Sequence, residues 1–467
     1  MLSFFRVNAA YQLLVLLVIL FLVRIPVLTG NTPLLIPELQ WMLLGEQLSK
    51  GFGLYDGIWD STAPLSAATY SAIHWIFGRS GSAYHLLAYG VAAFQILYFN
   101  VIMSRQNVYA ERNYIPGFIY LIVLNLSFDC TTLSPALMAT TFLLLALGTL
   151  LKQLDREGMK DELLEVGFYI GIATLFYPPC ICFILWAVLA LLLYSGASFR
   201  QHVMNILGFL FPIIIANLYF FLDGRYEAFS RNFLAMIFQI RQYDLNDFQT
   251  LIAVLLLPAL FAVLGFLKLI KYGRYTNFQS RVQQVMALYV GAALLSIGLM
   301  TFLAPMQFVL FSPALAFFGA YFFELYSRKR WIQEVSLMIY AIGSGLIFYL
   351  TLMPAFSNSV VKLEGLTVKP VQLPAEIREK RVLVVGASMG EYLDNYPATP
   401  YLNWNLARYD LENLDRYGNV INILRNFEQD LPEYIIDRQN LVPKLFKRIP
   451  ALGRKYQEIG KGIFRKV

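Results

Sequence analysis

The chain has 467 residues, of which 58% are hydrophobic, 15% aromatic and only 14% charged, with a mean hydropathy of +0.56 and a formal net charge of +7. This composition excludes a water-soluble globular protein of this size and predicts a polytopic membrane protein. The three cysteines have no His or Cys partner at metal-ligand spacing, so we predict no metal site.

Apolar runs recur along most of the chain and predict eleven transmembrane helices. The first run has no small-residue cleavage site after it, so we interpret it as a retained helix and not as a signal peptide. The predicted spans cover about residues 11–29, 82–103, 115–128, 133–151, 164–177, 180–196, 204–222, 250–267, 283–303, 306–326 and 334–353. Some runs are shorter than the about 17 residues that a spanning helix needs, so helices buried in the bundle or crossing half the membrane are the alternative.

Lys and Arg cluster in alternate loops, and short basic loops are typical of the cytoplasmic side of a membrane. With eleven spans, this pattern places the N-terminus in the cytoplasm and the C-terminus on the outer face of an inner (plasma) membrane. The long loops 30–81 and 223–249 then also lie on the outer face. An even number of spans would move the C-terminal residues to the cytoplasm.

Composition returns to ordinary polarity after the last span, which divides the chain into two predicted domains. Residues 1–354 are predicted to form an all-α membrane bundle with the two outer loops, and residues 355–467 a small α/β domain on the outer face. Within that domain we expect strands at Arg381–Gly386 and from Tyr434, a helix starting at Ser388, and a basic helical tail from Lys444. An outward-facing domain argues against nucleic-acid binding.

The outer segment 30–81 contains four acidic residues between its polar and aromatic side chains. Its periodicity predicts an amphipathic helix over Pro37 to Leu48 that lies on the membrane surface, then turns, then a second interfacial helix over Ser66 to Phe77. The acids are Glu38, Glu46, Asp56 and Asp60. A carboxylate on this face can serve as general base on an acceptor hydroxyl or amine while a lipid-linked donor stays in the bilayer.

Over about 50 residues the order of motifs in this segment resembles the first outer loop of the GT-C glycosyltransferases, the class that includes protein mannosyltransferases and the lipid A aminoarabinose transferase. The matching elements are Glu38, Leu44-Gly45-Glu46-Gln47-Leu48, Gly53-Leu54-Tyr55-Asp56, Pro64-Leu65 and Phe77-Gly78-Arg79-Ser80. The resemblance implies hexosyl or pentosyl transfer from a polyprenyl-phosphate donor. One position departs from it, because Pro37 stands where the family has a first acid. Glu38 is then the candidate base, with a solvated interfacial glutamate as the alternative.

Further candidate site residues follow from the same resemblance. Asp129, after the third span, is the second candidate catalytic acid, and its alternative is a helix N-cap that Thr131, Thr132 or Ser134 would supply equally. We assign substrate binding to Tyr55, Asp56 and Asp60, for which turn formation is the alternative.

The second outer loop, 223–249, interleaves three arginines with aromatic residues. Arg225, Arg231 and Arg241 are candidate ligands of the donor phosphate, because a guanidinium offers paired donors to a phosphate and aromatic rings can seat an isoprenoid chain. The loop also contains Glu227, Asp244 and Asp247, so an interfacial helix without a ligand is the alternative.

These features favour an integral membrane glycosyltransferase that transfers a sugar from a polyprenyl-phosphate donor to an acceptor on the outer (periplasmic) face. We expect a lipid-linked sugar donor and membrane lipid as partners and assign no cofactor. The alternative is a non-catalytic GT-C-like scaffold or accessory subunit with a protein partner in a cell-envelope complex. A transporter is disfavoured because the spans contain almost no ionisable residues and no two related halves are evident.

Overall fold

The computed structural model describes residues 1–30, 32–155, 161–235, 248–272, 275–324, 330–353 and 365–467. They form two compact units. The first comprises Met1–Thr32, Ser82–Tyr219 and Met236–Gly365, and the second Pro33–Gly81, Phe220–Ala235 and Leu366–Val467. The second unit therefore combines parts of both predicted outer loops with the C-terminal residues. The predicted boundary at residues 354 and 355 lies outside the described residues.

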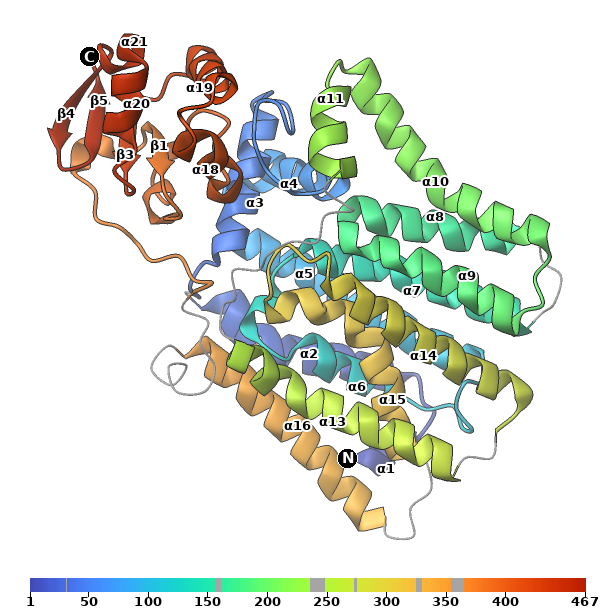
Figure 1. Ribbon diagram of the computed structural model, residues 1–467. Coiled ribbons are helices and arrows are strands. Elements are labelled where there is room, and N and C mark those ends of the chain that lie inside the picture. The colour runs from blue at the N-terminus through green and yellow to red at the C-terminus, as the bar shows by residue number, and fades with distance from the viewer. Residues whose placement is uncertain (31, 156–160, 236–247, 273–274, 325–329, 354–364) are drawn as a thin grey trace. The chain divides into compact units, whose positions relative to one another are not determined.

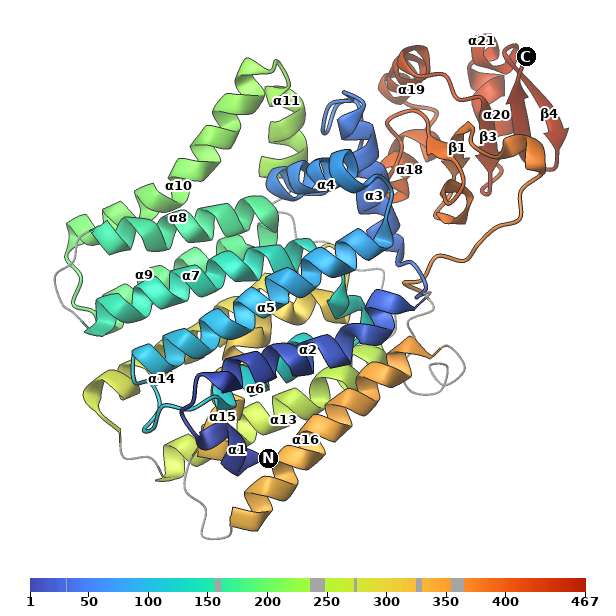
Figure 2. The same ribbon diagram turned by 180° about the vertical axis from the view of Figure 1, so that it is seen from behind.

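The first unit is a bundle of helices, several of which run alongside one another (Figures 1 and 2). A short α1 (Leu2–Arg6) precedes the long helices, and 3-10 turns occur at η1 (Phe128–Thr131), η2 (Pro178–Ile181) and η4 (Pro305–Phe311). The longer helices are α2 (Tyr11–Thr29), α5 (Gly81–Arg105), α6 (Ile115–Leu124), α7 (Pro135–Asp155), α8 (Asp161–Phe176), α9 (Cys182–Tyr194), α10 (Phe199–Leu222), α13 (Phe248–Tyr272), α14 (Asn277–Ile297), α15 (Ser312–Glu324) and α16 (Arg330–Leu352).

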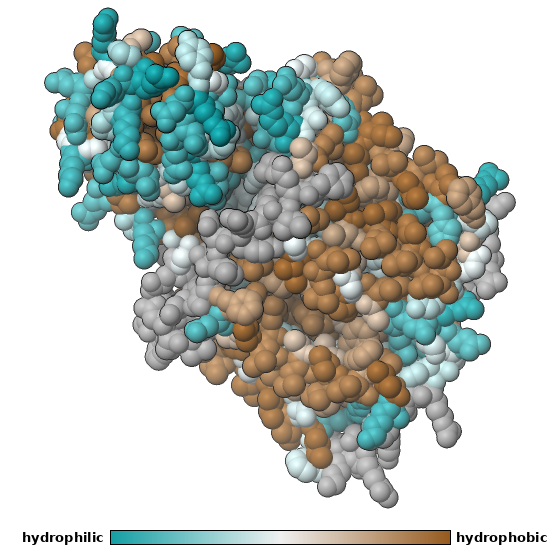
Figure 3. All heavy atoms as spheres, in the orientation of Figure 1, coloured by the Kyte–Doolittle hydropathy of each residue, from teal (hydrophilic) through white to brown (hydrophobic). Residues whose placement is uncertain are grey.

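This bundle identifies a multi-pass membrane protein. Each predicted span has a helix at its position, and among the described residues seven helices are long and apolar enough to cross a membrane. The count of eleven spans stays a prediction, because α6 and α9 have only 10 and 13 residues. Apolar side chains such as Leu207 and Ile214 are exposed on the bundle, and hydrophobic residues gather over its helices in Figure 3. Such a surface is suited to lipid and not to water.

Glycines let helices of the bundle approach closely. A Cβ added at Gly167 in α8 would lie 1.9 Å from the backbone oxygen of Asn205 in α10, and one added at Gly208 would lie 2.1 Å from that of Leu164. Small residues commonly line helix contacts in membranes, where close backbone packing replaces hydrophobic collapse. The pairing of α8 with α10 therefore depends on these two positions.

The second unit begins with two packed helices, α3 (Ile36–Ser49) and α4 (Pro64–Phe77), each with proline in its first two positions. The rings of Trp41 and Tyr70 stack between them at 5.4 Å. The two predicted helices are present, but Glu38, Glu46 and Gln47 of α3 are buried. The expected exposed polar face of α3 is therefore wrong, because protein and not water surrounds these side chains. The segment α11 (Tyr226–Phe229) and the π-helical turn η3 (Ser230–Leu234) also belong to this unit.

The C-terminal residues fold around a five-stranded sheet of order β2-β1-β3-β5-β4. Strand β1 (Arg381–Val385) is parallel to β2 (Tyr396–Pro397) and β3 (Tyr434–Asp437), whereas β5 (Ile463–Lys466) is antiparallel to β3 and β4 (Tyr456–Gly460). Four helices accompany it: α18 (Trp404–Glu412), α19 (Tyr417–Gln429), α20 (Val442–Arg448) and α21 (Pro450–Gly453). The apolar run of β1 is buried, as the parallel interior of a sheet requires.

Two expectations for this α/β part are corrected. The basic tail is helical only through α21, and its last residues form β4 and β5, of which β5 pairs with the distant β3. The expected helix from Ser388 is limited to the 3-10 turn η6 (Gly390–Tyr392). Both strands expected from sequence, β1 and β3, are present.

Backbone hydrogen bonds connect segment 33–81 to the C-terminal residues. The Ile36 amide donates to the Leu366 oxygen (2.7 Å), and the Trp59 amide donates to the Pro400 oxygen (2.7 Å). The Trp59 ring also packs edge-on against Tyr401 at 5.0 Å and adds to the apolar core beneath the sheet. Segment 33–81 and the α/β residues thus share one folded unit, in which most of the candidate site residues lie.

Candidate functional site

The candidate base Glu38 lies in the first turn of α3, directly after Pro37. Its side chain is fully buried, at 0% exposure, and a Cβ added at Gly81 would lie 4.0 Å from its Oε1 atom. Burial of this kind does not fit the alternative of a solvated interfacial glutamate, because ionised carboxylates normally stay in water unless the protein holds them.

Asp60, Gln40 and Thr62 form a second buried polar group in the same unit. The Gln40 Nε2 atom donates to Asp60 Oδ2 (2.6 Å), and the Thr62 amide donates to Asp60 Oδ1 (2.7 Å). Burial raises the pKa of Asp60, although these hydrogen bonds oppose the shift. Asp56 is exposed. Asp60 therefore fastens the turn after Asp56 to α3, which is the turn-forming role that the sequence left open.

Tyr55 sits at the tip of that turn with a positive φ of 72°. Its hydroxyl donates to the Thr62 oxygen (2.8 Å), and its ring packs against Phe220 and Phe229 at 6.0 and 6.2 Å. A non-glycine residue in this backbone region is strained and is held there by its surroundings. The aromatic contacts bring the first outer segment onto the start of the second one.

Arg225 is the arginine that this packing places beside the Tyr55 turn. A Cβ added at Gly53 would lie 2.5 Å from the Arg225 Cζ atom, so the guanidinium lies against the glycine backbone. Arg225 also pairs with Asp223 at 2.9 Å, with about a third of each side chain exposed. Arg231 instead forms an exposed pair with Glu227, and Arg241 lies outside the described residues.

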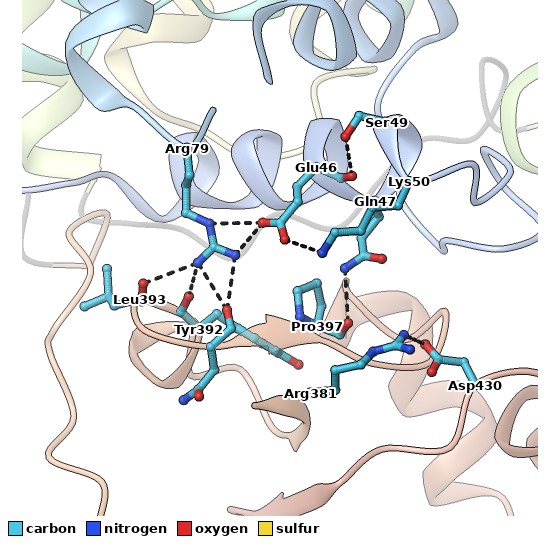
Figure 4. A network of polar contacts seen from close by, with 11 residues as sticks. Glu46, Gln47, Ser49, Lys50, Arg79, Arg381, Tyr392, Leu393, Pro397 and Asp430 are labelled. Carbon is cyan, nitrogen blue, oxygen red and sulfur yellow. Dashed lines mark hydrogen bonds and ion pairs between the residues drawn. The ribbon is translucent and has the colours of Figure 1, made fainter. Parts of the chain in front are cut away.

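A charged network on α3 joins the two parts of the second unit (Figure 4). Glu46, only 3% exposed, pairs with Lys50 (2.6 Å) and with the guanidinium of Arg79 (Nε to Oε2, 3.1 Å). The same guanidinium donates to the backbone oxygens of Tyr392 (2.8 Å), Leu393 (3.3 Å) and Asn395 (3.1 Å). Burial acts to raise the pKa of Glu46, but Arg79 and Lys50 outweigh it and hold that pKa below its ordinary value.

This network was not foreseen, since the sequence places Glu46 and Arg79 on separate elements. The available signal is a lone arginine after the C-terminus of α4 in an otherwise acidic segment. Because Arg79 uses its donors on Glu46 and on three carbonyl oxygens, its role is to hold the loop 392–395 against α3.

Asp129 lies in the first unit, in the 3-10 turn between α6 and α7, and is fully buried. Ser127 donates to its Oδ1 atom, and the Met306 amide donates to Oδ2 (2.7 Å). Burial raises the pKa of Asp129 to about 6. The carboxylate thus holds the start of η4 and not the start of α7, where the Ser134 hydroxyl accepts from the Leu137 amide (3.2 Å).

A buried arginine inside the bundle was also overlooked. Arg24 of α2 is 1% exposed and donates through Nε to Asn125 Oδ1 (2.7 Å), while its Nη1 and Nη2 atoms have no hydrogen-bond partner among the described residues. The sequence signal for it is that Arg24 interrupts the first apolar run. An ionisable residue within a span is a functional candidate by default. In the described parts of the chain, no group of three or more His, Cys, Asp or Glu residues is placed to hold a metal ion.

A model of the family described as "Family of unknown function (DUF6427)" matches residues 75–356. No curated protein matches the chain. Among solved structures, ArnT from Cupriavidus metallidurans bound to undecaprenyl phosphate is similar over 98% of this chain and 99% of that chain, with a TM-score of 0.62 and 11% sequence identity.

Two Archaeoglobus fulgidus structures match less closely, each with a TM-score of 0.49. They are the apo form of the oligosaccharyltransferase (11% identity, 91% of this chain and 69% of that chain) and AglB in complex with an inhibitory peptide and a dolichol-phosphate (12% identity, 98% and 74%). The likeness to ArnT extends over both whole chains and shows that this protein has the GT-C fold, as the motifs of segment 30–81 predict.

Proposed function

The chain belongs to the DUF6427 family, and we propose that it is a membrane glycosyltransferase that transfers a hexosyl or pentosyl group from a polyprenyl-phosphate donor. The acceptor is a glycan, lipid or protein on the outer (periplasmic) face of the inner membrane, with the N-terminus in the cytoplasm. The observation that supports this most is the GT-C fold over the full length of a protein solved with undecaprenyl phosphate. A polyprenyl-phosphate carrier for this chain is part of the proposal.

The acid chemistry of the proposal rests on Glu38 and Asp129. Transfer from a phosphate leaving group needs a base to remove a proton from the acceptor, and a buried carboxylate with a raised pKa is suited to that step near neutral pH. Asp129 has such a pKa, about 6, and Glu38 is buried in the unit that contains the outer segment.

The donor phosphate is assigned to Arg225. Its guanidinium lies on the Gly53 backbone and the side chain is about one-third exposed, so some of its N–H donors remain accessible to a ligand. A guanidinium can offer two parallel N–H donors to a phosphate. Arg231 and Arg241 stay in the proposal as further phosphate ligands, and Tyr55, Asp56 and Asp60 as residues that shape the substrate site.

The test uses the full chain in lipid nanodiscs with a panel of polyprenyl-phosphate hexoses and pentoses. Glu38→Gln removes the base while keeping size, and we expect at least about a 100-fold loss of kcat. Glu428→Gln is the matched control, because Glu428 is an exposed residue of α19 outside the proposed site, and it should keep full turnover. Arg225→Ala should raise the KM for donor more than Arg231→Ala does. Full activity of Glu38→Gln excludes Glu38 as the base.

Pro37 favours a second candidate function. Proline at the first positions of a helix is structurally preferred, and here it stands where the resemblance calls for an acid. A chain of this kind that has lost catalysis would serve as a scaffold or accessory subunit of an envelope complex. Co-purification of one stoichiometric protein partner, together with no turnover of any donor in the panel, would support this candidate over the enzyme.

A further inference from the structure

The second unit contains an open cavity of about 700 Å³ that none of the roles proposed above uses. Its volume falls in the range of about 300 to 1,000 Å³ that is typical of small-molecule sites. The residues that line it are Glu46, Lys50, His74, Arg79, Arg378, Glu379, Leu393, Asp394 and Tyr396. Almost all of them are polar, which distinguishes this cavity from the apolar pockets that bind lipid chains.

One wall of the cavity is fixed by the Arg79 network (Figure 4). Arg79 is occupied by Glu46 and by the carbonyl oxygens of the 392–395 loop, and the Glu379 amide donates to the Asp394 oxygen (2.9 Å) on the same loop. Arg79 and Glu46 therefore form the frame of the cavity and leave ligand contacts to its other residues. A frame held by charge-assisted bonds keeps those residues in place before a ligand arrives.

The charged residues that line the cavity are balanced: Lys50, Arg79 and Arg378 are positive, and Glu46, Glu379 and Asp394 are negative. Lys50 already pairs with Glu46, so the exposed Arg378, Glu379 and Asp394 remain for a ligand. His74 is a further lining group, and burial lowers its pKa, which favours the neutral imidazole. A wall with equal numbers of cations and anions gives no net attraction for a phosphate or a polyanion. It offers donors and acceptors in alternation, which matches a ligand whose hydroxyl groups both donate and accept.

Two further features suit a polyhydroxyl ligand. His74 lines the cavity, and a neutral imidazole has one donor and one acceptor nitrogen, as a hydroxyl group requires of its partners. The ring of Tyr396 is 38% exposed at the cavity, with the Lys50 ammonium 4.5 Å from its centroid. An exposed aromatic ring among hydrogen-bonding groups suits a sugar, which has apolar C–H faces and polar edges.

We propose that this cavity binds a neutral saccharide, and that this saccharide is the glycan acceptor of the transfer reaction. The second half of the statement rests on the proposed function, whereas saccharide binding does not. Tyr396 would stack on a sugar ring, and Asp394, Arg378 and His74 would bond its hydroxyl groups. The proposal narrows the acceptor to a glycan among the three classes named above.

The test measures binding without any donor, so its result does not depend on turnover. The full chain in nanodiscs is titrated by calorimetry with neutral di- to tetrasaccharides of glucose, galactose, mannose and N-acetylglucosamine, and with phosphorylated forms of the same sugars. We expect saturable binding of at least one neutral saccharide. Tyr396→Ala and Asp394→Asn should each weaken it at least about tenfold.

Matched controls are Tyr417→Ala and Asp415→Asn, which change exposed residues of the same types outside the cavity and should leave binding unchanged. The proposal is overturned by the absence of saturable binding to every neutral saccharide, by a preference for the phosphorylated forms, or by equal losses in the cavity and control variants. Binding that is lost in Tyr396→Ala, in a protein with no transfer activity on any donor, would retain the saccharide site and reject the enzyme.

Discussion

Replacing Arg79 with alanine removes the guanidinium that holds the 392–395 loop against α3. Glu46 is 3% exposed and keeps only Lys50 as a partner, at 2.6 Å, while the oxygens of Tyr392, Leu393 and Asn395 lose their donor. Removing one partner of a buried ion pair costs about 3–5 kcal/mol. Because Lys50 remains and the Arg79 side chain is 21% exposed, we expect a loss near the lower limit, about 3 kcal/mol.

Hydrogen exchange measures this loss where it occurs. The Tyr396 amide donates to the Lys380 oxygen (2.9 Å), and the Ala398 amide donates to the Val382 oxygen (2.9 Å), so both report on opening of the segment that Arg79 holds. A loss of about 3 kcal/mol corresponds to about a 100-fold faster exchange through local opening. Arg79→Lys keeps the positive charge but loses the paired N–H donors of the guanidinium, so its exchange rate should lie between those of Arg79→Ala and the natural protein.

Arg231→Ala is the matched control, because it breaks another arginine–glutamate pair, Arg231 with Glu227, whose side chains are 75% and 88% exposed. It should cost less than about 0.5 kcal/mol. If the amides of Tyr396 and Ala398 exchange in Arg79→Ala at the same rate, within error, as in that control, the buried network contributes no more than a solvated ion pair, contrary to this prediction.

Three further predictions follow from other residues. The pKa of Glu46 is held below its ordinary value, so ionised Glu46 stabilises the fold fully above the unfolded-state pKa of about 4.3. This stabilisation is lost as pH falls through the folded-state pKa. Hydrogen exchange of the 392–398 amides, corrected for intrinsic rates, should therefore accelerate in that acid range and not near neutrality. Gly45→Ala places a Cβ 2.4 Å from the Tyr70 oxygen and should cost at least about 2 kcal/mol in thermal unfolding, whereas Gly418→Ala, with nothing within 4 Å, should be neutral or slightly stabilising; equal effects would contradict the close packing of α3 on α4. With Asp129 as the base, its pKa of about 6 predicts a transfer rate that rises about tenfold per pH unit below that value and levels above it, and a rate independent of pH between about 5 and 7 would exclude it.

The helices of the bundle were accessible from sequence because hydropathy is a local property. A run of apolar side chains long enough to span a bilayer predicts a helix whatever it packs against. The position of each span was therefore predicted well, although α6 and α9 are too short to establish the count. The C-terminal tail was mispredicted for the opposite reason, since β4 and β5 are defined by their pairing with each other and with β3.

The candidate site was predictable only in part. The motif order around Tyr55 and Pro64 carried the resemblance to the GT-C class, which the fold confirms. It did not show that Asp60 is tied to Gln40, or that Arg225 lies on Gly53, because each contact joins residues that are far apart in the chain. Mean hydropathy does not reveal Arg24 either, since one charged residue hardly changes the mean hydropathy of a long apolar window.

Sequence alone determined that this protein is a polytopic membrane protein with a long acidic segment after its first apolar run and an α/β part after its last one, because composition and periodicity act over short windows. Only the tertiary structure decided what the acids of that segment do. Glu46 became part of a buried frame because folding brought Arg79 and the 392–395 loop to it, and Glu38 became fully buried. The burial and partners of a charge depend on contacts between distant segments, and these contacts establish whether a carboxylate supports the fold or is available for chemistry.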